Sequence, residues 1–486
     1  MKVMIAYPPL PSKKGQATLG QNRQFQWFSN PSYLYPVVPA IAATLLKQNG
    51  FDVVWKDAIA EEWTETQFNR FFEYEKPDLV AIETKTPVIK RHWGIIRHLK
   101  QLSPGTKFTL VGDHVTALPE ESMRQCPDLD YVITGGDYDV TLLNLALHLR
   151  DGTDLVGGVW FRQGDRIGNT GSFQLTHDLN SLPFIDRDLT NWCVYREYNF
   201  KRSPYTYVMA GRDCPWHKCT FCAWTTLYPV FRVRSPENLL DEIGVLIERY
   251  GVREIFDDAG TFPSGGWLRE FSAGMVERGY SKEVLYSCNC RADYVTPETA
   301  DLMKRAGMRL LKMGLESGNQ ATLDRIHKGI KVDQIRRACV TAKAAGLEVH
   351  LTMMVGYPWE SRDDAQRTLN LAKELMVSGA ADILQATVVV PYPGTPLHRE
   401  AIEEGWFVID PIDYDRYDMS EPILKTPMTA EETMGMCNRI YRDIFLSPQY
   451  VMRRLLSIRS FGDLAFTLKG AKAVMGHLAD FTFGRK

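Results

Sequence analysis

The sequence predicts an α/β protein with two parallel-sheet domains and a C-terminal helical extension. Short apolar strands alternate with helix-length amphipathic segments over residues 1–150, and the same alternation recurs from residue 205 to 390. From about residue 439 the chain instead mixes basic and apolar residues. We therefore expect four regions: a first domain over 1–150, a linker over 151–195, a second domain over 196–400 and the extension over 401–486.

Composition places the chain among ordinary globular proteins. Of its 486 residues 44% are hydrophobic and 24% charged, and the net charge of −2 gives no reason to expect a nucleic-acid partner. The nine cysteines are clustered, which fits a reducing cytosol better than a disulfide framework. Pro8 interrupts the start before a signal-peptide core forms, and no apolar run is long enough to span a bilayer. We expect a cytoplasmic protein.

The first domain is expected to be a doubly wound, flavodoxin-like parallel sheet, because five apolar strands alternate with helices. In such a sheet ligands bind at the carboxyl ends of the strands, near the topological switch point. The strands are expected at residues 2–7, 52–57, 79–84, 107–112 and 131–135. The helices are expected at residues 37–49, 64–75, 88–102, 117–125 and 138–150.

A linker with a hairpin over residues 157–168 leads into the second domain, which has six strand–helix units in series. Parallel barrels place their chemistry on the loops after the strands. The strands are expected at residues 205–210, 254–258, 284–290, 309–314, 348–354 and 383–390. The helices are expected at residues 235–250, 266–278, 297–306, 333–345 and 361–378.

Three cysteines, Cys214, Cys219 and Cys222, directly follow the first strand of the second domain. Three thiolates this close together suit zinc or an iron–sulfur cluster. A structural zinc site requires a fourth ligand, and none follows at ordinary zinc-ribbon spacing, although His217 lies inside the loop. A [4Fe–4S] cluster held by three cysteines keeps one iron open for a small molecule. The open cluster is the favoured interpretation and zinc the alternative.

The run from Gly211 to Trp224 resembles the signature of the radical S-adenosylmethionine (SAM) superfamily, although its first gap holds four residues where the family has three. The resemblance implies a partial (β/α)6 TIM-type barrel in which Cys214, Cys219 and Cys222 hold a catalytic [4Fe–4S] cluster. It also implies SAM contacts at the strand ends, with Arg291 pairing with the SAM carboxylate. The candidate SAM-binding residues are Phe221, Asp257, Asp258, Arg291, Glu316 and Ser317.

The first domain resembles the cobalamin-binding domain that precedes many radical SAM cores. The Asp-x-His-x-x-Gly motif of an axial histidine is absent, and Gly112-Asp113-His114 stands where the family has Gly-Gly-Pro-His. The carboxylate of Asp113 is expected to crowd or repel the phosphate of the nucleotide tail. The implied cobalamin contacts are Gly112, His114, Thr134 and Gly135. A cobalamin-bound domain and a fold kept without its cofactor both stay open.

Two further features each have two interpretations. Cys288 and Cys290 alternate on one strand, so both thiols are expected on the same side, either packed inside the barrel or serving an auxiliary metal or hydrogen-atom donation. Residues 439–486 carry nine Lys or Arg against three Asp, so this basic amphipathic stretch either caps the barrel or makes a peripheral contact with an anionic membrane. Its run from Phe445 to Arg454 resembles the ending of lipid-modifying radical SAM enzymes, including the hopanoid-tailoring members.

The resemblance implies an enzyme that cleaves SAM to a 5′-deoxyadenosyl radical and takes hydrogen from an unactivated carbon of a small-molecule or lipid substrate. A flavodoxin or ferredoxin would supply the electrons. Cobalamin-dependent methylation of a lipid, an isoprenoid or another secondary metabolite is the favoured outcome. The alternatives are cobalamin-free carbon–carbon bond formation, ring rearrangement or reduction, an N-terminal domain that only caps substrate or docks a protein, and a non-enzymatic, metal-stabilised binding protein.

Overall fold

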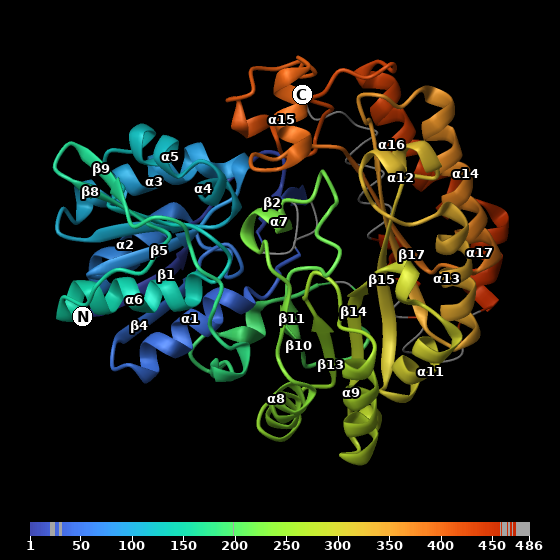
Figure 1. The fold of residues 1–486 in the computed structure, drawn as a ribbon, viewed down its shortest axis with the longest axis horizontal. Helices are drawn as coiled ribbons and strands as arrows, with labels where there is room; N and C mark the ends of the chain where they lie inside the picture. Colours follow the sequence, from blue (N-terminus) through green and yellow to red (C-terminus); the bar gives the residue numbers. More distant parts are fainter. Residues whose placement is uncertain are drawn as a thin grey trace.

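The computed structural model describes residues 1–19, 25–28, 32–197, 199–456, 458, 464, 467–468 and 470–472. Two parallel sheets lie side by side, the N-terminal one on the left of Figure 1 and the second one, opened toward it, on the right. This arrangement confirms the α/β fold that the sequence predicts.

The N-terminal sheet has the strand order β4-β1-β5-β6-β7-β8-β9. Its first five strands run parallel, and the order β4-β1-β5 places the switch point between β1 and β5. Strand β5 is buried along its whole length, as a sheet covered on both faces requires. The strands are β1 (Lys2–Tyr7), β4 (Asp52–Asp57), β5 (Leu79–Glu83), β6 (Lys107–Val111), β7 (Tyr131–Ile133), β8 (Val159–Gln163) and β9 (Arg166–Asn169).

The hairpin β8–β9 corrects one expectation. The sequence places it in a linker, but β8 pairs antiparallel with β7, so the hairpin extends the first sheet. The segment that connects the two domains therefore begins only after Asn169.

Helices cover both faces of the N-terminal sheet. Helix α1 (Val37–Gln48) packs beside α6 (Tyr138–Asp151), and α2 (Glu65–Glu75) beside α3 (Ile89–Leu102) on the opposite face (Figure 1). The helix expected at 117–125 is two short ones, α4 (Asp113–Ala117) and α5 (Pro119–Gln125). The break falls at Leu118 because the residue before a proline is disfavoured in helical conformation.

The second sheet has the order β10-β13-β14-β15-β16-β17, and all its pairs are parallel. Its strands are β10 (Tyr205–Val208), β13 (Glu254–Asp257), β14 (Leu285–Cys290), β15 (Met308–Glu316), β16 (Glu348–Val355) and β17 (Ile383–Val388). Its outer helices are α8 (Pro236–Glu248), α9 (Gly266–Glu277), α11 (Pro297–Arg305), α13 (Val332–Ala344) and α14 (Arg362–Ser378). The edge strands β10 and β17 do not pair with each other in the described chain, so the barrel is partial and has an open side.

Segments from both parts of the chain lie over this open side. The hairpin of β2 (Gln16–Thr18) and β3 (Gln26–Phe28) reaches the segment after α15 (Pro396–Glu403), where Lys14 pairs with Asp418 at 2.6 Å. Helix α16 (Ala430–Phe445) packs on α14 and β17, and α17 (Pro448–Leu456) packs on α14.

The extension thus caps the barrel edge as far as α16, whereas α17 has no buried residue. Four of its basic residues, Arg459, Lys469, Arg485 and Lys486, lie outside the described residues. None of the helices described here is both long enough and apolar enough to cross a membrane.

Candidate active site

The cysteine loop leaves the end of β10 and is closed at its base by a short antiparallel ladder. Strand β11 (Gly211–Arg212) pairs with β12 (Arg232–Val233), so residues 213–231 form a pinched loop above the barrel edge. His217 takes a left-handed conformation (φ 55°) and pairs with Asp213 at 2.5 Å. Because an extra residue in a loop is readily absorbed by such a turn, the four-residue gap is accommodated locally.

Trp216 fixes this loop against the barrel. Its indole nitrogen donates to the carbonyl of His327 at 2.6 Å, and its ring lies 4.8 Å from the guanidinium of Arg291. A Cβ at Gly329 would lie 2.0 Å from the indole ring, so this position requires glycine. The loop is therefore held in place by side chains as well as by the β11–β12 ladder.

The spacing of the three thiols helps to distinguish a [4Fe–4S] cluster site from a zinc site. All three cysteines are free and half-buried. Among the described residues, one group of three His, Cys, Asp or Glu side chains has its ligand atoms all within 4.8 Å of one another, and it is Asp137, Asp139 and His177. The three cysteines do not form such a group. Sulfurs about 2.3 Å from a tetrahedral zinc ion lie only about 3.8 Å apart. The three-thiol donor set suits a [4Fe–4S] cluster, and at least one pair of its sulfurs lies beyond 4.8 Å, farther apart than two ligands of one tetrahedral zinc ion.

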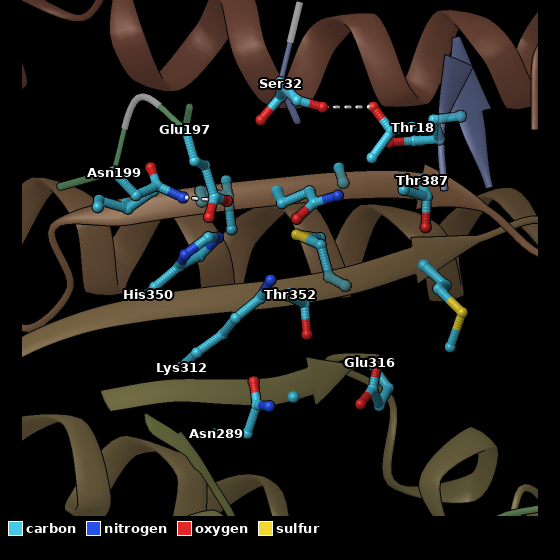
Figure 2. Close-up of a pocket in the computed structure, with 18 of the residues that line it drawn as sticks. Thr18, Ser32, Glu197, Asn199, Asn289, Lys312, Glu316, His350, Thr352 and Thr387 are labelled. Atoms are coloured by element: carbon cyan, nitrogen blue, oxygen red, sulfur yellow. Dashed lines mark hydrogen bonds between the residues drawn. The ribbon is translucent and has the colours of Figure 1, made fainter. Parts of the chain in front are cut away.

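A cavity of about 900 Å³ runs from the cysteine loop into the partial barrel. Its wall contains Cys214, Cys219 and Cys222 at the carboxyl ends of the strands. Figure 2 shows polar side chains of β14, β15 and β16 pointing into it, with Glu316 at the strand ends and Lys312 and His350 deeper in the barrel. The N-terminal domain contributes Lys85 and Asp113, so the cavity is shared by both sheets.

Four of the six SAM candidates line this cavity, and two do not. Phe221, Asp258, Arg291 and Glu316 form part of its wall. Asp257 is instead buried below it, where it accepts hydrogen bonds from the Tyr286 hydroxyl at 2.7 Å and from the backbone N–H of Ala259 at 3.0 Å. Burial raises the pKa of Asp257 to about 6. This carboxylate organises the turn after β13 and does not face the cavity.

Ser317 also points away from the cavity. Its hydroxyl donates to Glu360 at 2.8 Å and lies 3.1 Å from the hydroxyl of Thr368. These contacts tie the end of β15 to α14. The role of Ser317 in this structure is to hold the strand end in place.

The Glu360 carboxyl in this network gives a pH-dependent prediction. Burial raises its pKa from 4.5 to about 7. The folded chain therefore keeps this proton at pH values where the unfolded chain has lost it, so stability falls as the pH rises from about 4.5 to 7, by about 3 kcal/mol. Glu360→Gln should remove this part of the pH dependence while keeping an acceptor for Ser317.

Urea midpoints at pH 5 and pH 8 check this, with Glu374→Gln at an exposed ion pair as the matched control. An identical loss of stability in the wild-type chain and Glu360→Gln would contradict the assignment.

Sequence reasoning missed Lys328, although it stands next to the SAM candidates. Its ammonium pairs with the Glu316 carboxylate at 2.7 Å in a buried position on the cavity wall. A Cβ at Gly314 would lie 1.9 Å from that carboxylate, so glycine makes room for the pair. Lys328 follows α12 (Gln320–Arg325) in a turn, and no spacing rule points from it to Glu316.

Two residues at the strand ends of the N-terminal domain lie on the cavity wall, on the side where cobalamin would bind. Lys85 and Asp113, at the ends of β5 and β6, form a buried ion pair at 2.9 Å on the cavity wall. Asp113 therefore does not present an unbalanced negative charge to a phosphate, contrary to the sequence-based expectation. Gly112 has φ 116°, and a Cβ there would lie 2.4 Å from the Thr84 carbonyl oxygen. The charge-balanced polar edge of Lys85 and Asp113 fits the amide-rich corrin of cobalamin, whereas glycine at position 112 lets the backbones of Gly112 and Thr84 pass close to each other.

None of the four cobalamin candidates, Gly112 included, is part of the cavity wall. His114 is buried, with its ring 4.7 Å from that of Tyr414. Thr134 donates to the Gly158 carbonyl at 2.8 Å, and a Cβ at Gly135 would lie 2.6 Å from the Phe173 ring. Segments of this same chain therefore cover the end of β7.

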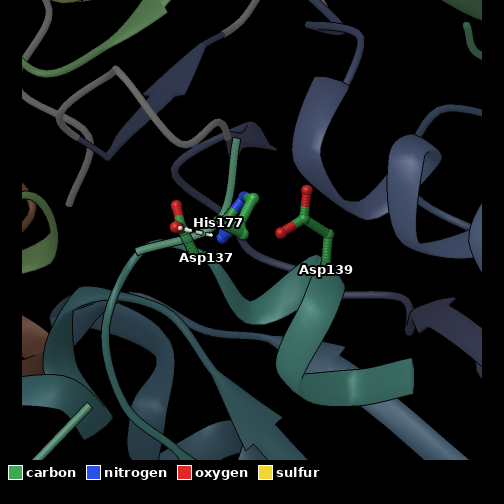
Figure 3. A group of neighbouring side chains, drawn as sticks. All are labelled: Asp137, Asp139 and His177. Carbon is green, nitrogen blue, oxygen red and sulfur yellow. Dashed lines mark ion pairs between the residues drawn. The ribbon is translucent and has the colours of Figure 1, made fainter. Parts of the chain in front are cut away.

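Asp137 and Asp139, just after β7, belong to a buried cluster that joins the two domains (Figure 3). Arg212 contacts both carboxylates, at 2.6 Å from Asp137, and Arg232 donates to Asp137 at 2.8 Å. His177 lies 3.0 Å from Asp137. We call Asp137, Asp139, His177, Arg212 and Arg232 the interdomain lock. Because two guanidinium groups already balance its two carboxylates, the group is an ion-pair network and not a cation site.

The two alternating cysteines of β14 lie in different surroundings. Cys290 lines the cavity, whereas Cys288 is completely buried and is not part of its wall. Burial raises the pKa of both thiols, that of Cys290 to about 12. Packing remains the favoured interpretation for Cys288.

The comparisons with known proteins agree with this geometry. Residues 208–372 match the radical SAM superfamily, and residues 31–141 match the B12 binding domain. A protein of Pyrococcus horikoshii described as an uncharacterized methyltransferase is 26% identical over 95% of this chain and 96% of its own length. An anaerobic magnesium-protoporphyrin IX monomethyl ester cyclase of Rubrivivax gelatinosus is 24% identical over 86% of this chain and 74% of its own.

The hopanoid C-3 methylase of Methylococcus capsulatus is 25% identical over 83% of this chain and 75% of its own length. Among solved structures, the radical SAM methyltransferase TsrM from Kitasatospora setae, with cobalamin and a [4Fe–4S] cluster bound, superposes with a TM-score of 0.68 at 14% identity, covering 98% of this chain and 99% of that one. With both regions matched and the cysteine loop at the mouth of the cavity, the chain carries a radical SAM domain over residues 208–372 and a B12-binding domain over residues 31–141.

Proposed function

We propose that the chain is a cobalamin-dependent radical SAM methyltransferase that acts on an unactivated carbon of a metabolite. The proposal rests on one cavity whose wall is shared by three features. They are the cysteine loop, the Glu316–Lys328 pair and the Lys85–Asp113 pair of the B12-binding domain. A shared cavity lets SAM, a corrinoid and a substrate meet, as methyl transfer requires.

Different residues of the cavity wall are assigned to the cluster, the corrinoid and SAM. Cys214, Cys219 and Cys222 would hold the cluster, and Lys85 with Asp113 would face the corrinoid. In this family the cluster supplies the electron that cleaves SAM, and cobalamin supplies a carrier for a methyl group. Arg291, held by Asp293 through two hydrogen bonds of 3.0 and 2.9 Å, presents a fixed guanidinium at the cavity wall for the SAM carboxylate.

Glu316 is proposed to bind the SAM ribose. Lys328 fixes its carboxylate at the cavity wall, where it can accept hydrogen bonds from hydroxyl groups. Glu316→Gln should weaken SAM binding roughly tenfold, because a charge-assisted acceptor is lost. Calorimetric titration of SAM into the reconstituted enzyme measures this, with Glu298→Gln at an exposed ion pair as the control. Unchanged affinity would remove Glu316 from the SAM site.

Methylation is preferred to cyclisation, because relatives over most of the chain include a methyltransferase and a methylase, although a cyclase is also among them. The non-enzymatic alternative has no support. The experiment that tests methylation reconstitutes the enzyme anaerobically with and without hydroxocobalamin and measures S-adenosylhomocysteine and 5′-deoxyadenosine. Corrinoid-dependent S-adenosylhomocysteine is expected. Formation of 5′-deoxyadenosine with no corrinoid retained would favour rearrangement or reduction instead.

The proposal includes a lipid or isoprenoid substrate, a flavodoxin- or ferredoxin-type reductant and a peripheral membrane contact. Exposed Leu446, Met452, Leu455 and Leu456 on and before α17 support the contact, since Arg442, Arg453 and Arg454 stand beside them. Cosedimentation with anionic and neutral vesicles distinguishes this contact from simple capping, which predicts no binding to either.

A further inference from the structure

The interior of the partial barrel carries a group of polar side chains among its apolar ones. Parallel barrels normally fill their interior with bulky branched apolar side chains. Here the cavity wall also carries polar residues two apart along neighbouring strands (Figure 2). They are Asn289 of β14, Lys312 of β15, His350 and Thr352 of β16, and Gln385 and Thr387 of β17. We call these six residues the polar chamber.

The residues of the polar chamber both donate and accept hydrogen bonds. Asn289 and Gln385 offer an amide N–H and a carbonyl, the threonines offer hydroxyls, and Lys312 offers an ammonium. Asn289 donates one amide N–H to the carbonyl of Ala259 at 2.8 Å, and a ligand in the cavity can form hydrogen bonds with the polar groups that face it. Glu197, whose carboxylate accepts from Asn199 at 3.2 Å, adds an acidic group to the same wall, so the chamber is not a purely cationic site for phosphate.

The same cavity continues to an apolar exit on the open side of the barrel. Beyond β17 most of its wall is apolar or aromatic and includes Tyr441 and Phe445 of α16 and Tyr450, Val451 and Leu455 of α17, with Arg454 of α17 as a charged residue among them. Val451 and Leu455 are 44% and 57% exposed, so the apolar wall reaches the surface. One continuous cavity thus changes from polar inside the barrel to apolar between β17 and the C-terminal helices.

We propose that the substrate is amphipathic, with a polyhydroxylated head group held in the polar chamber and an apolar body lying along α16 and α17. This inference rests on the proposed function in that the cavity is taken as the substrate site. The order of polar and apolar residues along the cavity wall sets the orientation of the proposed substrate. Lys312 and Glu316 lie on the same strand, so the head group is on the side of the proposed SAM site, and the apolar body points outward. Neither half alone fills both parts of the wall.

The test titrates three probes into the reconstituted holoenzyme by calorimetry: n-octyl β-D-glucopyranoside below its micelle concentration, methyl β-D-glucopyranoside, and 1-octanol. The octyl glucoside is expected to bind at least about tenfold more tightly than either half-probe. Lys312→Met and Gln385→Leu should each weaken octyl glucoside by about tenfold without changing octanol binding. Val451→Asp and Leu455→Asp should weaken both octyl probes, and Val340→Asp, at an exposed position of α13, should change neither.

Octanol binding as tight as octyl glucoside, no binding of octyl glucoside, or no effect of Lys312→Met would each overturn the inference. Iron content and SAM affinity of every variant show that it is folded. Corrinoid-dependent S-adenosylhomocysteine is measured in the same preparations. Probe binding without that product would leave the amphipathic site standing and remove the methyltransferase proposal, whereas the product without probe binding would do the reverse.

Discussion

Replacement of any one of Cys214, Cys219 and Cys222 by alanine is expected to reduce bound iron from about four per chain to below about one and to abolish SAM cleavage. All three thiols line the same wall of the cavity and stand within nine residues of one another on one loop. The loss should be similar for each of the three, because a cluster with two protein ligands is not retained.

The measurement is anaerobic purification and reconstitution, with iron, labile sulfide and zinc quantified together with the visible spectrum. Cys193→Ala provides the matched control, because Cys193 is an exposed free thiol outside the cavity. Stoichiometric zinc without iron in the wild-type chain would contradict the cluster assignment, and so would full iron retention in the three variants.

Asp139→Ala in the interdomain lock is expected to cause the largest loss of stability among single substitutions at charged residues. The carboxylate is completely buried and contacts Arg212, which is only 2% exposed. Removal of one partner leaves a buried guanidinium without its full counter-charge, which costs about 3–5 kcal/mol. Because Arg212 stands two residues before Cys214, the same change is expected to loosen the cysteine loop and to lower iron retention.

Urea unfolding followed by far-ultraviolet circular dichroism measures the first effect, and iron content after gel filtration measures the second. Glu298→Ala is the matched control, because its exposed pair with Arg269 contributes only about 0–1 kcal/mol. The double variant Asp139→Leu, Arg212→Met should recover most of the lost stability, since no unpaired charge then remains buried. If Asp139→Ala is no less stable than Glu298→Ala, the lock does not join the domains.

Most of the fold could be predicted from sequence because its strands are buried on both faces. The apolar run of β5 is bounded by polar turns, and its limits agree with expectation to within a residue, as do those of β16. The hairpin β8–β9 shows where this reasoning stops. Its local pattern predicts a hairpin, but its pairing with β7 depends on a long-range edge that no local pattern encodes.

The site was predictable where chemistry follows a strand directly and not where side chains meet from distant turns. Cys214, Arg291 and Glu316 each come just after or at the end of a strand, and the topology brings them to one cavity. Lys328 reaches Glu316 from a turn, so only the structure reveals the pair. Gly135 stands in the position of a family motif, but Phe173 from a remote segment covers it.

The contact between Lys14 and Asp418 bears on how the cofactor is acquired during synthesis. The cysteine loop leaves the ribosome about 200 residues before Asp418, an interval of about 10–40 s at ordinary elongation rates. Throughout that interval helices α16 and α17 have not been made, and the segment before the hairpin β2–β3 lacks its ion-pair partner Asp418. A cluster-donating protein can therefore reach the nascent thiols before the C-terminal helices of the chain have been made.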